Sequence, residues 1–192
     1  MQRDEVLQLV EATIAVDATT AAREQVTDAI VTATRVKAWL DSRLVDFAHA
    51  LERMGAAAED VMASASRSDS RDAERVVKRA ATARKAPLFG KALADGKVAS
   101  GHLDQLGNSL RRLDTDQQRS ALLADEQRLA IIAANSTPDE FAKTLRAEER
   151  RLSADDGMSR LERQRSSVRL NRRTDLETGM NIFTLSLDPV TG

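Results

Sequence analysis

A stripe of apolar residues spaced alternately four and three positions apart constrains the fold of this 192-residue chain more than any other feature. The stripe runs from Val26 to Met54, and only Lys37 interrupts it. This spacing places all its members along one face of a long helix, and that face must pack against another helix. Gly55 follows directly and suits the C′ position that ends a helix.

Two arrangements of this helix are compatible with the stripe. One is a helical hairpin within the chain, which bundles build from the same pattern and which we favour. The other is a coiled-coil homodimer. The interaction surface predicted along the stripe consists of Val26, Ile30, Leu40, Leu44, Phe47 and Leu51.

The composition indicates a helical core without a metal or cofactor. Apolar residues make up 42% of the chain but aromatic residues only 3%, so the core consists mainly of Ala, Leu, Val and Ile, which suit closely packed helices. The chain has no Cys and two His, which excludes a disulfide framework and a thiolate metal site. We therefore expect no metal and no cofactor in this chain, and a reducing, cytoplasmic location.

The sequence contains no pattern that indicates a membrane or a small-molecule substrate. The longest apolar run, from Leu129 to Ala134, is far shorter than the roughly 20 residues that cross a bilayer. No Walker pattern is present, and no GxGxxG follows a predicted strand. We expect no membrane as a partner, and the sequence identifies no small-molecule substrate.

Start and stop signals predict several further helices. Asp69 or Ser70 can cap a basic helix that ends near Lys85, and Ser100 can cap a later helix. Further signals are Pro87 as the start of a short helix, Asp95-Gly96 as its end, and the capping boxes Thr115 with Gln118 and Thr137 with Glu140.

The end of the chain alternates between polar and apolar residues. The runs SVRLNR and MNIFTLSLD, separated by TDLETG, predict a β-hairpin. The predicted fold class is mainly α: a multi-helix bundle with one long heptad-striped helix and a C-terminal β-hairpin. Residues 1–65 would form a long-helix region and residues 66–192 a helical domain, or both would form one continuous domain.

Basic residues are concentrated in two segments, although the net charge is only −1. Residues 66–91 carry eight basic and three acidic side chains, and a second Arg-rich run lies within residues 146–173. On a helical wheel the first set forms one face opposite a face of Ala and Val. The predicted nucleic-acid-binding residues are Arg71, Arg75, Lys78, Arg79, Lys85, Arg111 and Arg112. The alternative is a solvated face whose charges pair with acidic neighbours.

No catalytic constellation is recognisable among the polar residues. His49 lies away from the apolar stripe, so we expect it to be exposed to solvent, and we expect His102 to bond a nearby backbone group. Acidic pairs such as Asp155-Asp156 do not converge with a base or a nucleophile in any predicted cleft. We therefore predict no catalytic residue in this chain.

Residues 85–113 predict a short helix, a glycine turn and a second helix directly behind the basic helix. A groove-reading DNA binder needs that order of elements, and so does any compact helical hairpin. The segments GKVASGHLDQL, LRRL, RSSVRLNRR and the closing LDP resemble a large actinobacterial family, the domain of unknown function two hundred and twenty-two or REP thirteen-E-twelve repeat proteins. The resemblance covers about residues 66–192, and Ala99 stands where the family usually has a hydroxyl residue.

The resemblance implies a context for the chain. Members commonly carry a C-terminal HNH endonuclease domain, in which clustered His and Asn bind a divalent metal, and no such cluster exists here. The chain would then be a non-catalytic N-terminal region that engages or positions duplex DNA, with a metal only if an HNH domain follows. The alternative function is a protein-interaction or homodimerisation module that binds no nucleic acid.

Overall fold

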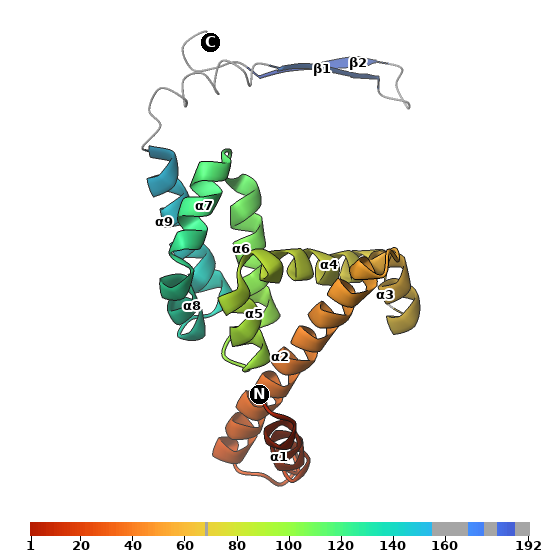
Figure 1. Cartoon of the computed structure of the whole chain (residues 1–192), viewed down its shortest axis with the longest axis vertical. Helices are drawn as coiled ribbons and strands as arrows, with labels where there is room; N and C mark the ends of the chain where they lie inside the picture. Colours follow the sequence, from red (N-terminus) through yellow and green to blue (C-terminus); the bar gives the residue numbers. More distant parts are fainter. Residues whose placement is uncertain (68, 155–168, 175–179, 187–192) are drawn as a thin grey trace. The chain divides into compact units, whose positions relative to one another are not determined.

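The computed structural model describes residues 1–67, 69–154, 169–174 and 180–186, and this part of the chain is mainly helical (Figure 1). It divides into two compact units, Met1–Glu149 and Arg150–Gly192. The described helices are α1 Arg3–Ile14, α2 Arg23–Arg53, α3 Ala58–Ser66, α4 Ser70–Lys85, α5 Pro87–Ala94, α6 Ser100–Arg112, α7 Asp116–Ala124, α8 Glu126–Ala134 and α9 Pro138–Ala154. The long-helix region and the basic helix, which were predicted on either side of residue 65, belong to the same unit.

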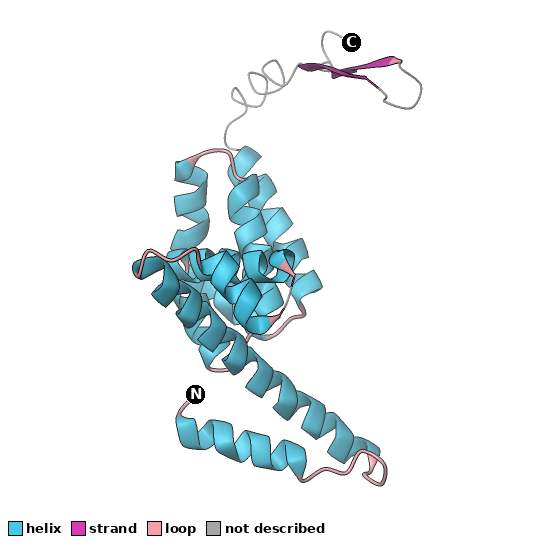
Figure 2. Cartoon of the chain, turned by 90° about the vertical axis from the view of Figure 1, so that its right-hand side faces the viewer, coloured by secondary structure: helices cyan, strands magenta, loops and turns pink. Residues whose placement is uncertain are grey.

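The described part of the second unit contains two short strands (Figure 2). Strand β1, Arg169–Thr174, pairs antiparallel with β2, Asn181–Ser186, and Leu170 lies opposite Leu185. Residues 155–168, 175–179 and 187–192 lie outside the described residues. They include the predicted turn, so the hairpin as a complete unit stays a prediction, and they include part of the Arg-rich run within residues 146–173.

Most helix ends lie where local signals predicted them. Gly55 has a φ of 74° at the end of α2, and the N–H of Ala56 bonds the carbonyl of Leu51 at 3.0 Å, as in a Schellman motif. Asp69 caps α4 by accepting a bond from the N–H of Asp72 at 2.8 Å. Both predicted capping boxes are present, at the starts of α7 and α9.

Two helix ends differ from the prediction. The N-cap of α6 is Ala99 and not Ser100, because the ring of His102 accepts a bond from the Ala99 N–H at 3.1 Å, as the Glu or Gln of a capping box does. Likewise, the helix expected after Thr115 breaks at Asp125 into α7 and α8. The break allows Glu126 to reach α5, where its carboxylate accepts bonds from the N–H groups of Leu88 and Phe89 at 2.7 and 3.2 Å.

The core of the first unit lies among α5, α6, α8 and α9. Phe89 of α5 and Phe141 of α9 are fully buried, with ring centroids 5.6 Å apart. Leucines from the surrounding helices fill the remaining space. The fully buried ones among the largest side chains are Leu93, Leu103, Leu106, Leu113, Leu122, Leu129 and Leu145.

Helix α2 presents to this core the face opposite to the predicted one. Its buried residues are Ala38, Ser42, Val45 and Ala48. At about 100° per residue, the stripe through Leu40 and Phe47 points to the other side of the helix, and both side chains remain 51% exposed. Helix α2 packs within the chain, against α1, α4 and α5 among others, but burial of the stripe was wrong. Small side chains let α4 and α5 approach α2 more closely than leucines would.

Helices α4 and α6 approach closely at a Thr–Gly contact. A Cβ placed on Gly107 would lie 2.6 Å from Oγ1 of Thr82. That hydroxyl is buried and donates to the carbonyl of Lys78 at 2.9 Å. Only glycine at this position allows the two helices to be so close.

We expect Gly107→Ala to destabilise the protein by about 1–3 kcal/mol, because the added methyl overpacks the α4–α6 contact. Thermal or urea denaturation followed by circular dichroism measures the loss. Thr82→Ala removes the clashing oxygen, so the double variant should recover part of the lost stability. If Gly107→Ala costs the same with either residue at position 82, the contact is not the cause.

Candidate nucleic-acid interface

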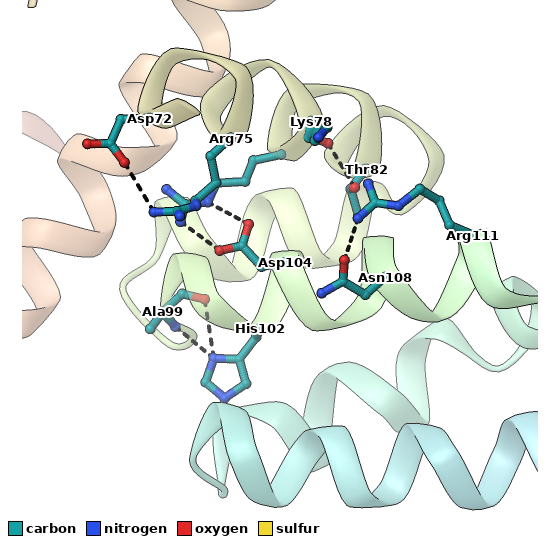
Figure 3. Close-up of polar contacts among 10 residues, drawn as sticks. Asp72, Arg75, Lys78, Thr82, Ala99, His102, Asp104, Asn108 and Arg111 are labelled. Carbon is teal, nitrogen blue, oxygen red and sulfur yellow. Dashed lines mark hydrogen bonds and ion pairs between the residues drawn. The ribbon is translucent and has the colours of Figure 1, made fainter. Parts of the chain in front are cut away.

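A groove lined by basic side chains runs between α4 and α6. Its first part has a volume of about 570 Å³ and its second part, which shares Lys78 and Arg111 with it, about 360 Å³. Five predicted residues line it: Arg71, Arg75, Lys78, Lys85 and Arg111. Figure 3 shows Arg75 and Lys78 on α4 above Asp104, Asn108 and Arg111 on α6.

The sequence of α4 explains why these side chains converge. Ala73, Ala80, Thr82 and Ala83 are buried, so small residues hold α4 against its neighbours. The long basic residues recur three or four positions apart and so share one edge of the helix. The floor of the groove is the contact between Thr82 and Gly107, which both parts of the groove include.

Arg79 is withdrawn from the groove by a carboxylate of α6. Its Nε and Nη2 atoms donate to the two oxygens of Asp104 at 2.8 and 2.7 Å, and the Arg79 side chain is 16% exposed. Burial lowers the pKa of Arg79, but the hydrogen bonds and charge of Asp104 raise it by a larger amount. The net pKa therefore lies above its usual value. This predicted binding residue therefore joins two helices.

Arg112 also binds a carboxylate. Its Nε and Nη2 atoms donate to Glu149 of α9 at 3.0 and 2.6 Å. Burial raises the pKa of Glu149, while the hydrogen bonds and the charge of Arg112 lower it by more, and the net pKa is below its usual value of 4.5. Arg112 does not line the groove, although it is adjacent in sequence to Arg111.

The ion pairs that Arg75 and Lys78 form are exposed and lie within α4. Arg75 contacts Asp72 at 3.2 Å and Lys78 contacts Glu74 at 2.5 Å, with each of these side chains about half exposed. The hydrogen bond and charge of Lys78 lower the pKa of Glu74. Exposed pairs of this kind contribute little to stability, so a phosphate could replace the acidic partner at small cost.

Arg119 of α7 also lines the groove, and sequence reasoning missed it. Its guanidinium donates to the carbonyls of Leu110 and Leu113 at 3.1 and 2.6 Å, next to the end of α6. The helical wheel of α4 carries no information about a residue of another helix. Only the fold of α7 against the end of α6 brings Arg119 to this place.

The two histidines have structural roles. His49 was expected to be exposed, but it is half-buried, and its Nε2 donates to the carbonyl of Ala80 in α4 at 2.7 Å. His102 is buried as expected of a backbone-bonding residue, and its Nε2 bonds the carbonyl of Ser136 at 3.0 Å. Figure 3 shows the other side of its ring bonded to the backbone of Ala99. The first turn of α6 is therefore held within the core. This packing does not favour α6 as a recognition helix that enters the major groove of DNA.

No group of three or more potential metal ligands lies together within the described residues. None of the helices in that part of the chain is long and apolar enough to span a membrane. Comparison with protein-family models, curated proteins and solved structures found no match for the chain. The family resemblance therefore stays a prediction.

We expect Arg79→Met to lower the free energy of unfolding by about 1.5–3 kcal/mol, because it leaves the partly buried Asp104 without its charged partner. Arg75→Met is the matched control on the same helix, and we expect it to cost about 0–1 kcal/mol, since that pair is exposed. Urea denaturation of both variants and of Asp104→Asn measures the difference. Equal losses in the two arginine variants would contradict the structural role of Arg79.

We expect the Arg112–Glu149 pair to contribute about 1 kcal/mol or less at neutral pH, given that Arg112 is 48% exposed. Because the folded-state pKa of Glu149 is lowered, this contribution is present above pH 4.5 and disappears as the pH falls through the lowered value. Thermal denaturation of Glu149→Gln should therefore show a deficit at neutral pH that vanishes in acid. Glu11→Gln, at an exposed site on α1, is the control, and a deficit that persists in acid would contradict the assignment.

Proposed function

We propose that this chain binds duplex DNA through its backbone phosphates along the groove between α4 and α6. The observation that carries the proposal is the convergence of Arg71, Arg75, Lys78, Lys85, Arg111 and Arg119 on this groove. Two carboxylates, those of Glu74 and Asp104, line the same groove, and Arg79 already binds that of Asp104. Guanidinium and ammonium groups at this density suit phosphate oxygens.

The absence of aromatic side chains from the groove lining favours duplex over single-stranded nucleic acid. Binding of single strands generally needs aromatic rings on which bases stack. Phe89 and Phe141 are buried in the core, and Phe47 lies on α2. A basic groove without rings contacts phosphates and supplies affinity without base recognition.

The proposed role is to hold or position DNA, and no group of three or more potential metal ligands lies together within the described residues. If the family resemblance is correct, the chain precedes an HNH nuclease domain. The groove would then bind DNA on which that domain acts. This context rests on the resemblance alone.

We expect the triple variant Arg75→Gln, Lys78→Gln, Arg111→Gln to bind duplex DNA more weakly and with less dependence on salt. Each lost phosphate contact lowers the slope of log affinity against log salt by about one. Six contacts would reduce wild-type affinity roughly 10³-fold between low and moderate salt, and the triple variant would lose only tens of fold. Fluorescence anisotropy with a labelled duplex at several salt concentrations measures both quantities.

The control is Arg23→Gln, Lys91→Gln, Lys97→Gln, which removes the same charge from exposed positions outside the groove. Its affinity and salt slope should remain close to those of the wild type. The proposal is wrong if the wild-type chain does not bind duplex DNA at low salt. It is also wrong if both triple variants lose affinity equally, because binding would then depend only on net charge.

A further inference from the structure

The apolar stripe of α2 forms an exposed face on the side of the helix opposite to the core. Leu40 and Phe47 are each 51% exposed, Leu44 is 38% exposed, and Ile30 and Met54 are 61% and 78% exposed. Soluble proteins usually bury side chains of this size. Here five of them lie in line at heptad spacing.

The end of the stripe is hollowed where α3 folds back against α2. Leu44, Phe47, Leu51 and Met54 line this apolar groove together with Val61 and Met62 of α3, and its volume is about 500 Å³. At 1.5 Å per residue, the stripe from Ile30 to Met54 is roughly 36 Å long. The start of the stripe carries the exposed side chain of Ile30, and its end is a groove.

We propose that this face pairs with a second copy of the chain, α2 against α2 in antiparallel orientation. The proposed register places Leu40 opposite the partner's Leu44 and Ile30 opposite the partner's Met54. Ile30 at the start of each stripe then enters the groove at the end of the other stripe. A two-fold axis makes both contacts identical, which is the property of an isologous interface.

Lys37 decides between antiparallel and parallel pairing. In a parallel pair it would lie against the partner's Lys37, so two ammonium groups would meet in an apolar seam. In the antiparallel register Lys37 lies opposite the partner's Phe47, where its aliphatic stem packs on the ring and its charge reaches solvent. Lys37, which interrupts the stripe, therefore disfavours the parallel arrangement.

The size of the face is consistent with a dimer. The exposed apolar area is on the order of 500 Å², which is in the range of functional patches on soluble proteins. With its polar rim, the paired length of α2 and the edge of α3 would supply the roughly 800 Å² per partner that a specific interface buries. The DNA-binding groove lies between α4 and α6, so this proposal is independent of the proposed function.

Sedimentation equilibrium of the full chain over a wide concentration range tests the pairing. We expect the wild type to be dimeric at high concentration and Phe47→Glu to raise the dissociation constant at least ~30-fold. Val31→Glu is the matched control, because Val31 is 56% exposed on the same helix but lies away from the stripe. Circular dichroism confirms that both variants remain folded.

Cysteine pairing tests the orientation, since the chain has no native Cys. Lys37→Cys mixed with Phe47→Cys should form a disulfide-linked heterodimer on oxidation, and neither variant should link efficiently to itself. In the antiparallel register, like positions lie about 15 Å apart along the axis, too far for a disulfide. Efficient self-linking of Lys37→Cys would indicate the parallel arrangement and overturn the register.

Two further results would overturn the proposal. A wild-type chain that stays monomeric at the highest concentration excludes the second copy and leaves the face to a different protein. A dimer that Phe47→Glu and Val31→Glu weaken equally excludes the stripe as its interface. Neither result bears on DNA affinity, which the charge variants of the groove test separately.

Discussion

The close contact between α4 and α6 is the constraint on which the candidate site depends. Gly107 leaves no side chain between the helices, and Thr82 fills the space with a hydroxyl bonded within its own helix. Because the facing residues are small, the long basic side chains of α4 cannot point inwards and must line the edges of the crossing. The same packing principle governs α2, whose Ala and Ser face is buried and whose Leu and Phe face is exposed.

Local chemistry made most of the helix ends predictable. Proline at the start of α5, glycine after α2, the aspartate before α4 and the two capping boxes are short-range signals, and the structure uses all of them. Ala99 was not predictable in this way, because its partner is the ring of His102, whose role depends on the packing of α6. The break at Asp125 likewise brings Glu126 to α5, a contact that spans 38 residues.

The candidate site was predictable only as far as one helix determines it. The periodicity of α4 placed Arg71, Arg75, Lys78 and Lys85 on one edge, and the structure agrees. Arg79 and Arg112 bind carboxylates that lie 25 and 37 residues away in the sequence. The helical wheel of one helix cannot show such partners. For α2, both faces had helical periodicity, and the larger side chains concealed that the smaller ones form the better packing surface.

The carboxylate of Glu126 makes the folding of the segment from α5 to α6 depend on α8. Helix α5 has no capping side chain of its own, since Ala86 precedes it, and its first amides bond to α8 instead. Its positive end is therefore neutralised by a residue outside the segment. Helices α5 and α6 therefore do not form a module that is independent of α8. Amide hydrogen exchange at the start of α5 is linked to the opening of α8, so α5 and α8 form one cooperative folding unit.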